Sequence, residues 1–491
     1  MTVISLITGL FFWTAFFSET SLQVDFSLEQ MFPESDPEKD AYQSFIDEFN
    51  REDDKILLVY DCDNPTSREN IASVADLTET MQLDIEGVEG VISLSNIDEG
   101  DYFSEDLSDF EWNQQVQDLL LHPIYPNLII STDGKTGALL IDLEDDILGQ
   151  DSRAHVVHEL EKVMNSVDWE WHEAGIPILR TRYIQFMNRE RAIFLPISFL
   201  VAMIVLFFIF RQLKSILIPL IAISTVLIWV AGIMAYLGIS INVVSYLTFN
   251  LLMIIGASNA IHLLMKYHEG LSLGLNQRDS LDRVIQKIGG ALFLTSFTTA
   301  VGFCSLGFTN IKVTQQFGLL VGFGVILMFI LTIIIMPIIL NYIRPPDTEH
   351  IDRLIRGGQF LAAGRLNAWN QKNPVPILTV SAVLFIVAVF GLFRIDYNAS
   401  ILEDLKPGNP LFDDLQYVEK KMGGTLPLEV IIDTKTENGS LQPGFLENIQ
   451  KFKKKILKTP EINTAVTPGD YLMLANEEWG GGVRKLPETE D

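Results

Sequence analysis

Three neighbouring polar side chains lie in the second half of a largely apolar stretch, and their types are the ones in this chain best suited to chemistry. The stretch runs from Val243 to Met265 and carries Ser258, Asn259 and His262. A hydroxyl or an amide forms hydrogen bonds but does not exchange a proton near pH 7, whereas an imidazole does. The pattern indicates a hydrogen-bonding site in which His262 alone could act as a proton relay. Its place within a turn of Lys266 is more typical of a solvated histidine, which is the interpretation we favour.

Two stripes of small and hydroxyl residues accompany this site. At 100° per residue, Thr248, Gly256 and Asn259 share one helical face. A second apolar stretch, Ala291–Phe308, repeats such residues at i, i+3, i+4 and i+7, namely Thr295, Thr298, Thr299 and Gly302. Stripes of this kind let membrane helices pack closely, and we favour that role. The alternative is that both stripes face each other and line a polar path through Asn259.

Other constellations do not favour catalysis or metal binding. His155, His158 and Glu159 lie together on an amphipathic segment, but no third ligand at metal-site spacing accompanies them. A solvated helix face is the simpler interpretation. We find no nucleophile elbow or phosphate-binding glycine loop. The sequence therefore predicts no catalytic residue, no cofactor and no metal, and the protein is not expected to be an enzyme.

Seven apolar stretches of the chain meet or approach the length of roughly 20 residues that a membrane-spanning helix needs. They are Thr2–Phe17, Ala192–Phe210, Ile216–Leu237, Val243–Met265, Ala291–Phe308, Phe317–Ile343 and Val375–Phe393. None contains an Asp or a Glu. We predict a membrane α-helical bundle.

The charges of the connecting loops predict its orientation. Lysines and arginines gather after the second, fourth and sixth stretches, whereas Gly238–Asn242 has no charge and Thr309–Gln316 has only Lys312. Because basic loops stay in the cytoplasm, the two large polar regions, 18–191 and 394–491, are expected outside the membrane. We expect a multi-pass protein of the cell inner (plasma) membrane with periplasmic domains.

The first outer region is strongly acidic. Of the formal net charge of −28, nearly all falls between Glu19 and Arg191, which holds about 40 acidic and about 11 basic side chains. Such a region repels nucleic acid, so no nucleic-acid partner is expected. Its charge is typical of a highly soluble domain. Cys62 and Cys304 lie in regions of different character, so the sequence indicates no disulfide.

Strands and helices alternate in this region. Lys55–Asp61, Val91–Ser95 and Ala138–Leu143 are predicted strands, and Ser67–Met81 and Ser152–Val167 are predicted amphipathic helices. This pattern is typical of α+β folds, and we expect two small subdomains of the split βαβ, ferredoxin-like type.

The chain contains an internal repeat. The first copy consists of a helix followed by the strings LQVDFSLEQMFPESDP and KILLVYDCD. The second copy consists of a helix followed by the similar strings FRIDYNASILEDLKPGNP and LEVIIDTK. Pro37 then corresponds to Pro410, and Ile56–Asp61 to Leu428–Asp433. Duplication of this sort is common in transporters. We expect one complete half (helix 1, 1–17; outer domain, 18–191; helices 2–6, 192–343), an amphipathic cytoplasmic connector (344–374), helix 7 (375–393), and the start of a second, incomplete outer domain (394–491).

Several strings resemble the RND superfamily, in particular its MMPL-like, hydrophobe-exporting branch. They are GIPILRTRYIQFMNRER, FRQLKSILIPL, GGALFLTSFTTAVGFCSLGF and QQFGLLVGFGVILMFILTIIIMPIIL, in the order and spacing that the family shows. The resemblance covers nearly the whole chain. It implies proton-driven export of lipids or other hydrophobic compounds through periplasmic porter domains. It also implies a relation to sterol-sensing domains, which share the block of helices 2–6.

The chain departs from the family at its coupling motif. Relatives carry an intramembrane Asp in a string similar to GVDYAI or GIADAIHLL, whereas this chain reads GASNAIHLL from Gly256 to Leu264. The two alignments put Ser258 or Asn259 at the Asp position, and both are neutral. Either the relay Asp lies in a second half, or the protein is a non-transporting lipid or sterol sensor or carrier. The expected partners are the bilayer and a lipid or hydrophobic small molecule; a homo-oligomer or a periplasmic or outer-membrane partner stays open.

Overall fold

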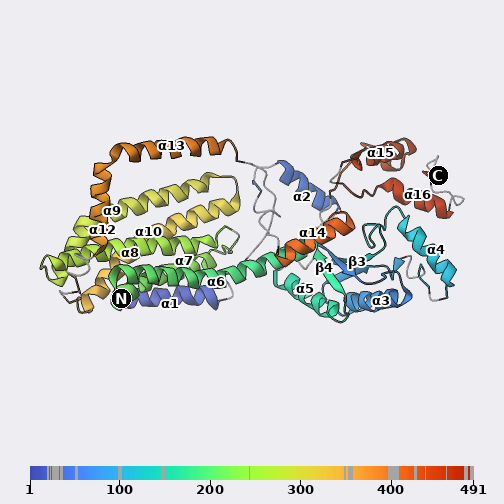
Figure 1. Ribbon diagram of the computed structural model, residues 1–491. Coiled ribbons are helices and arrows are strands. Elements are labelled where there is room, and N and C mark those ends of the chain that lie inside the picture. Colours follow the sequence, from blue (N-terminus) through green and yellow to red (C-terminus); the bar gives the residue numbers. More distant parts are fainter. Residues whose placement is uncertain are drawn as a thin grey trace. The chain divides into compact units, whose positions relative to one another are not determined.

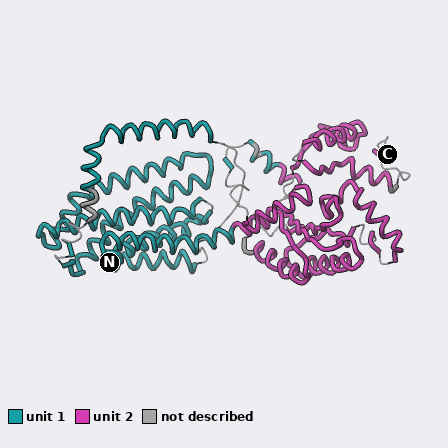
Figure 2. The backbone as a smooth tube through the Cα atoms, in the orientation of Figure 1, with its two compact units in different colours: residues 1–44, 184–398 teal, residues 45–183, 399–491 magenta. Residues whose placement is uncertain are grey.

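The computed structural model describes most of the 491 residues. The described residues are 1–18, 22, 24, 32–33, 37–49, 54–97, 102–104, 106–144, 150–242, 244–347, 350–351, 358–395, 408–424, 428–436, 438–459, 462–479 and 485–486. They divide into two compact units (Figure 2). Unit 1 comprises Met1–Ser44 and Ile184–Asn398, and unit 2 comprises Phe45–Tyr183 and Ala399–Asp491.

Long apolar helices make up unit 1, and Figure 1 labels them. Among the described residues, six helices are long and apolar enough to cross a membrane. They are α6 (Ile176–Phe210), α7 (Leu213–Tyr236), α8 (Leu247–Ser272), α9 with the 3₁₀ turn η3 (Gln277–Cys304 and Ser305–Phe308), α10 (Lys312–Tyr342) and α13 (Pro374–Leu392). Each coincides with a predicted span, so the prediction of a multi-pass helical membrane protein is confirmed.

The first predicted span is a shorter helix, α1 (Thr2–Phe16). It packs along α7, where the indole N–H of Trp229 donates to the hydroxyl of Thr8 at 2.9 Å and the Phe11 ring lies 5.6 Å from that of Trp229. Gly232 permits this approach, because a Cβ there would lie 2.7 Å from the Phe11 carbonyl oxygen. Close helix contact at a glycine is a common feature of membrane bundles.

The helices of unit 1 pack through their apolar faces. α10 contacts α7, α8 and α9. A Cβ on Gly318 would lie 2.5 Å from the Phe303 carbonyl oxygen, and one on Gly322 would lie 2.5 Å from Cys304 Sγ. The GxxxG pair of α10 is therefore a contact surface for α9, as its spacing predicts.

Between α10 and α13 the chain forms α12 (Gly358–Lys372), which occupies the predicted connector. The exposed fractions of Leu366 and Trp369 are 66% and 57%. Leu354 and the side chains of Phe360 and Leu361, on which the amphipathic pattern also rested, lie outside the described residues.

A four-stranded antiparallel sheet with the order β2-β3-β1-β4 forms the centre of unit 2. Its strands are β1 (Lys55–Asp61), β2 (Val88–Ile92), β3 (Thr136–Leu143) and β4 (Glu170–Ala174). In the register of the central pair, Leu58 faces Leu139. The core forms here because Ile56, Leu58, Val59 and Tyr60 of β1 are fully buried. The four described strands between residues 55 and 174 thus belong to one sheet, and the division of the region into two small subdomains stays a prediction.

Several helices accompany the sheet in unit 2. α3 (Arg68–Leu83) follows β1, α4 (Asp109–Leu120) follows β2, and α5 (Gln150–Met164) follows β3. Ser67 caps α3, and Ser108 and Glu111 form a capping box on α4, so the starts of these helices are encoded locally. A second core cluster includes Trp112 and Leu119 of α4 together with Ile129 and Ile130.

The repeated segments form similar helices. α2 (Pro37–Phe49) and α14 (Pro410–Met422) each have 13 residues and begin at the matched prolines. Proline suits the first helical position because its fixed φ is already helical and its missing N–H would be unpaired there. After α14 come α15 (Pro443–Ile456) and α16 (Pro468–Trp479). The matched Asp25, Phe26, Asp396 and Tyr397 lie outside the described residues.

Candidate functional site

The polar residues predicted on α8 separate onto two faces of that helix. Thr248, Gly256 and Asn259 are buried, with exposed fractions of 0% for Thr248 and 5% for Asn259. Ser258 and His262 are exposed, on a neighbouring face of the helix. The shared face predicted for the first three residues is confirmed, and the two alignments of the coupling motif therefore point to physically different positions.

α8 and α10 run parallel at this site. A Cβ on Gly324 would meet the side chain of Leu252, and a Cβ on Gly256 would meet Met328 and, from α7, Ile223 at 2.8–2.9 Å. Ala260 follows Gly256 by one turn of α8, and Thr332 follows Met328 by one turn of α10. Gly256 thus lets α7 and α10 approach α8 immediately beside Asn259.

Asn259 and Thr332 bring polar atoms into this apolar contact. Thr332 is 2% exposed. Neither the Asn259 Nδ2 nor the Thr332 Oγ1 has a hydrogen-bond partner within the described part of the chain, and the same holds for Thr248 Oγ1 and Ser296 Oγ. An unpaired buried polar group costs about 1–3 kcal/mol. Groups that carry this cost are suited to bind a polar ligand or to pair in another conformation.

The threonine stripe of α9 does not face Asn259. Thr295 and Thr298 are exposed and Thr299 is half-buried. Their hydroxyls donate to carbonyls of their own helix, for example Thr295 to Ala291 at 2.9 Å and Thr299 to Thr295 at 2.8 Å. The buried face of α9 instead carries Leu292, Ser296 and Ala300. The alternative in which both stripes line one path through Asn259 is therefore wrong.

Sequence reasoning missed Ser296 and Thr332. Thr332 is a single hydroxyl in an apolar run, and Ser296 lies between the threonines of the predicted stripe but off its spacing, so no pattern marks either residue. Only the packing of α9 and α10 against neighbouring helices shows that these residues point inward.

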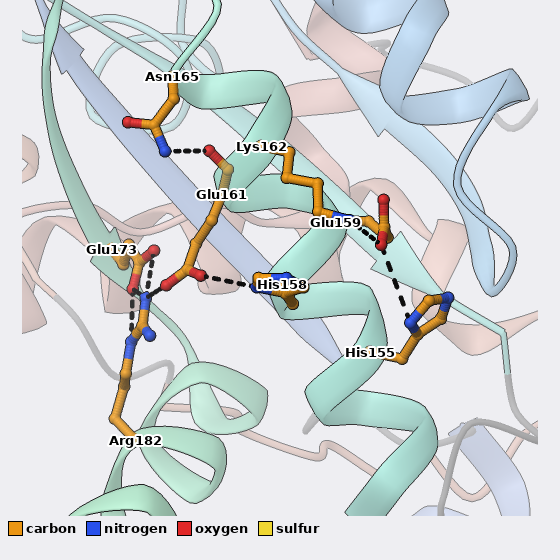
Figure 3. Close-up of polar contacts among 8 residues, drawn as sticks. All are labelled: His155, His158, Glu159, Glu161, Lys162, Asn165, Glu173 and Arg182. Carbon is orange, nitrogen blue, oxygen red and sulfur yellow. Dashed lines mark hydrogen bonds and ion pairs between the residues drawn. The ribbon is translucent and has the colours of Figure 1, made fainter.

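The histidines of α5 belong to a polar helix face in unit 2 (Figure 3). His155 and His158 are largely exposed, and each faces a glutamate of its own helix: Glu159 at 4.0 Å and Glu161 at 3.4 Å. Lys162 binds Glu159 at 2.7 Å. A search of the described residues finds no group of three His, Cys, Asp or Glu side chains that could hold a metal ion.

A buried ion cluster ends this polar face. The guanidinium of Arg182 donates to both carboxylate oxygens of Glu173, at 2.6–3.0 Å, and lies 2.5 Å from Glu161 (Figure 3). Burial raises the pKa of the Glu173 carboxyl, and Arg182 opposes that rise. The cluster joins β4, α5 and the first turns of α6, the helix that continues into unit 1.

A groove of about 430 Å³ lies between α3 and α5 in unit 2. Its lining combines Leu77 and Val163 with the charged side chains of Asp76, Glu159 and Lys162. An apolar substrate would have to desolvate these charges, so the groove is poorly suited to a lipid tail.

Helix α14 docks on the sheet through aromatic and ionic contacts. The Tyr417 ring stacks on that of His172 with 3.7 Å between centroids, and His172 Nδ1 lies 2.8 Å from Asp414 Oδ1. The Tyr417 hydroxyl donates to Asp61 of β1. Burial, followed by the hydrogen bond to Asp61, raises the pKa of Tyr417 to about 12. Helix α14, from the region 394–491, thus packs on the sheet that residues 55–174 form.

Long apolar helices with buried polar positions, attached to an α+β unit, define a multi-pass membrane protein. A family model described as the MMPL family matches residues 30–371. The chain belongs to the MMPL family.

Curated proteins with similar sequences carry the names of membrane or transport proteins. The chain is 22% identical over 369 residues to "Probable transport protein MmpL12" of Mycobacterium tuberculosis, which covers 71% of this chain and 31% of that protein. It is 22% identical over 306 residues to "Probable transport protein MmpL10" of Mycobacterium leprae, covering 58% and 30%. A membrane protein of Methanocaldococcus jannaschii is 22% identical over 182 residues, covering 37% and 46%. The chain matches less than half the length of each relative.

Proposed function

We propose that this chain exports lipids or other hydrophobic compounds across the inner (plasma) membrane and that the proton gradient drives the export. Its membership of the MMPL family, over both the outer region and most of the membrane helices, is the observation that carries the proposal. Family and relatives alike point to transport rather than catalysis. The substrate would be a lipid or another apolar molecule taken from the bilayer or its outer surface.

We place the coupling site at the middle of α8. Asn259, Gly256 and Thr248 form its buried face, while Ser258 and His262 offer polar atoms on the exposed face. The buried Asn259 Nδ2, which has no hydrogen-bond partner within the described residues, supports Asn259 as the position that responds to an ion. Thr295, Thr298 and Thr299 are exposed or half-buried, so their contribution would be contact with another helix.

The outer domain is proposed to be a porter domain of the split βαβ, ferredoxin-like type. The strand order β2-β3-β1-β4 supports this, with α3 between β1 and β2 and α5 between β3 and β4. We divide the chain as its sequence suggests: helix 1 (1–17), porter domain (18–191), helices 2–6 (192–343), cytoplasmic connector (344–374), helix 7 (375–393) and a second porter domain from 394.

Two features support a duplicated architecture. α2 and α14 begin at matched prolines and have equal lengths. The segment matching β1 includes Leu428, Val430 and Ile431, which are 78%, 54% and 56% exposed. The counterparts in β1 are almost fully buried, so the second segment has the composition of a central strand but none of its burial. Strands of a second sheet, a further copy or a periplasmic or outer-membrane partner could cover it.

Substitution of Asn259 by Asp tests the coupling site. In energised cells that express the chain, efflux of a lipophilic dye should become more strongly proton-dependent with Asn259→Asp, because a carboxylate replaces an amide that cannot exchange protons. Ser258→Asp, one residue away on the exposed face, tests the other position to which the family Asp aligns. Equal effects of both substitutions, or no effect of either, would remove Asn259 from the coupling role.

A non-transporting sensor or carrier of lipids or sterols is the second candidate, favoured by the absence of Asp and Glu from the predicted spans. A sensor would bind lipid equally well with and without an ion gradient, whereas an exporter would stop moving it when the gradient is lost.

A further inference from the structure

Helix α15 is basic, although the chain as a whole has a formal net charge of −28. Lys451, Lys454 and Lys455 recur at i, i+3 and i+4, the spacing of one helical face, and Lys458 follows in the turn after the helix. All four are exposed, and together they form what we call the basic patch. Lysines at this spacing repel one another and destabilise a helix slightly. An anionic partner would remove that repulsion.

The opposite face of α15 is occupied. Leu446 is fully buried, and α15 packs on α16. Lys453, the one lysine of α15 outside the basic patch, pairs with the nearly buried Asp470 at 2.9 Å. In the patch itself, Lys451 lies 3.4 Å from Glu447 of the same helix, and the other three lysines form no ion pair within the described residues. The patch is therefore free to contact another surface.

An aromatic side chain borders the basic patch. Phe452 is 42% exposed, and at 100° per residue it lies about 60° around the helix from Lys455. At protein interfaces a buried aromatic side chain supplies much of the binding energy, whereas charges around it set the choice of partner. α15 thus carries an apolar anchor beside a cationic face, which is the pattern of a helix that docks in a groove.

The groove between α3 and α5 has a complementary lining. Its apolar part includes Leu77, and its polar part includes Asp76 and the Glu159–Lys162 ion pair. Asp76 is exposed and forms no ion pair within the described residues, and the same holds for Glu79, three residues further along α3. A groove of this kind is unsuited to a lipid tail but suits a cationic helix with one aromatic anchor.

The charge distribution of the chain points to a second copy as the source of that helix. Nearly all of the net negative charge lies in the region 19–191, which contains the groove, whereas the basic patch lies in the region 394–491. Within one chain the two surfaces are not paired, because no lysine of the patch forms an ion pair with α3 or α5 among the described residues. Two copies can pair them through a heterologous contact.

We propose that α15 of one copy docks in the α3–α5 groove of a second copy. Phe452 then contacts the apolar lining around Leu77, and the basic patch faces the carboxylates of Asp76 and Glu79. Each copy contributes one helix and one groove, so the contact joins the two outer regions of neighbouring copies. The proposal does not rest on the export function.

Self-association of the whole chain in detergent, measured by analytical ultracentrifugation over a range of protein concentrations, tests the proposal without any substrate. Lys451→Glu combined with Lys455→Glu should weaken association by about ten-fold or more, because like charges then face each other. Asp76→Lys combined with Glu79→Lys should do the same. Raising the salt concentration should also weaken association of the unsubstituted chain. Lys435→Glu, at a lysine that is 83% exposed and lies outside α15, is the control and should have no effect.

The aromatic anchor is tested separately. Phe452→Ala should weaken association by about five- to ten-fold, because an interface loses its central aromatic contact. Phe110→Ala, at a phenylalanine that is 79% exposed and lies outside both surfaces, is the matched control and should leave association unchanged.

Mixing the two charge-reversed chains is the decisive measurement. The acidic groove of the lysine-substituted chain can accept the normal α15 of the other chain, so the mixture should associate with about the affinity of the unsubstituted protein. Neither variant alone should do so. Because the mixed complex requires both chains to be folded, its recovery excludes misfolding as the reason for the losses.

A chain that stays monomeric at all concentrations would overturn the proposal, as would a mixture that associates no more strongly than either variant alone. It would also be overturned if the lysine substitutions abolished binding to vesicles of anionic lipid but left self-association intact, since the basic patch would then belong to a membrane surface. Dye efflux measures export independently, so failure of the one proposal can be told from failure of the other.

Discussion

At the scale of single residues, Arg182 is the side chain that pairs with two carboxylates, of which that of Glu173 is nearly buried. It is bidentate to Glu173, whose side chain is 10% exposed, and it also binds Glu161. Removing one partner of a desolvated pair leaves the other charge buried and unpaired. The sequence did not indicate this cluster, since its members lie on three different elements.

We expect Arg182→Gln to lower the free energy of unfolding of unit 2 by about 2–5 kcal/mol, because Glu173 and Glu161 would then face each other without a cation. Urea unfolding followed by tryptophan fluorescence measures this. Lys55→Gln is the control: its pair with Asp142 is half-exposed, so its loss should cost less than about 1 kcal/mol. Equal losses for both variants would contradict the assignment.

Asp470 makes the α15–α16 pair sensitive to acid. Burial alone would raise the pKa of Asp470, but hydrogen bonds from Lys453, Thr467 and Gln450 outweigh it and hold that pKa below its usual value. A lowered carboxyl pKa contributes stability above the unfolded-state value of about 3.9, and this stability is lost as the pH falls through the folded-state pKa.

Protection of residues 443–479 from hydrogen exchange should therefore decrease as the pH is lowered below about 4. In Asp470→Asn the protection should be lower at neutral pH and should lose this acid-dependent step. An unchanged step in the variant would assign the acid response to another group.

At the scale of elements, the contact between α9 and α10 depends on Gly318. A methyl group there would lie 2.5 Å from the Phe303 carbonyl oxygen and 2.6 Å from the Leu306 Cβ, both on the opposing segment. Gly318→Ala should therefore destabilise the helix bundle by about 1–3 kcal/mol.

Gly290→Ala is the matched control, because a Cβ on Gly290 meets nothing within 4 Å. It should be neutral or stabilising by up to about 1 kcal/mol. Thermal unfolding in detergent compares the two variants. If Gly318→Ala melts no earlier than Gly290→Ala, the close approach of α9 and α10 is incorrect.

The spans were predictable from sequence because apolar runs near 20 residues leave few alternatives. The start of α6 was not: residues 176–191 are helical but too polar to be recognised as part of a span. β4 was missed because EWHEA is short and lacks the alternation of apolar and polar residues that marks a strand.

The candidate site was predicted only in part. The shared face of Thr248, Gly256 and Asn259 followed from helical spacing. Helical spacing did not predict that Thr295 and Thr298 point outward. A threonine hydroxyl can form its hydrogen bond within its own helix and then needs no polar neighbour. Periodicity identifies residues that share a face, but packing decides which face is buried.

At the scale of the whole molecule, the orientation of the chain in the membrane can be tested by labelling. In a background of Cys62→Ser and Cys304→Ser, Phe110→Cys in unit 2 should react with an impermeant maleimide in intact cells, since Phe110 is 79% exposed. Leu273→Cys, which follows α8 and replaces a residue that is 59% exposed, should react only after the membrane is opened. The reverse pattern would invert the proposed topology.

The central claim is that the chain moves hydrophobic compounds at the expense of an ion gradient. We would measure efflux of a lipophilic dye from energised cells expressing the chain, before and after a protonophore collapses the proton gradient. Efflux above that of cells lacking the chain, abolished by the protonophore, is the predicted result. Dye or lipid binding that persists unchanged after collapse, with no efflux at any stage, would contradict export and favour the lipid sensor.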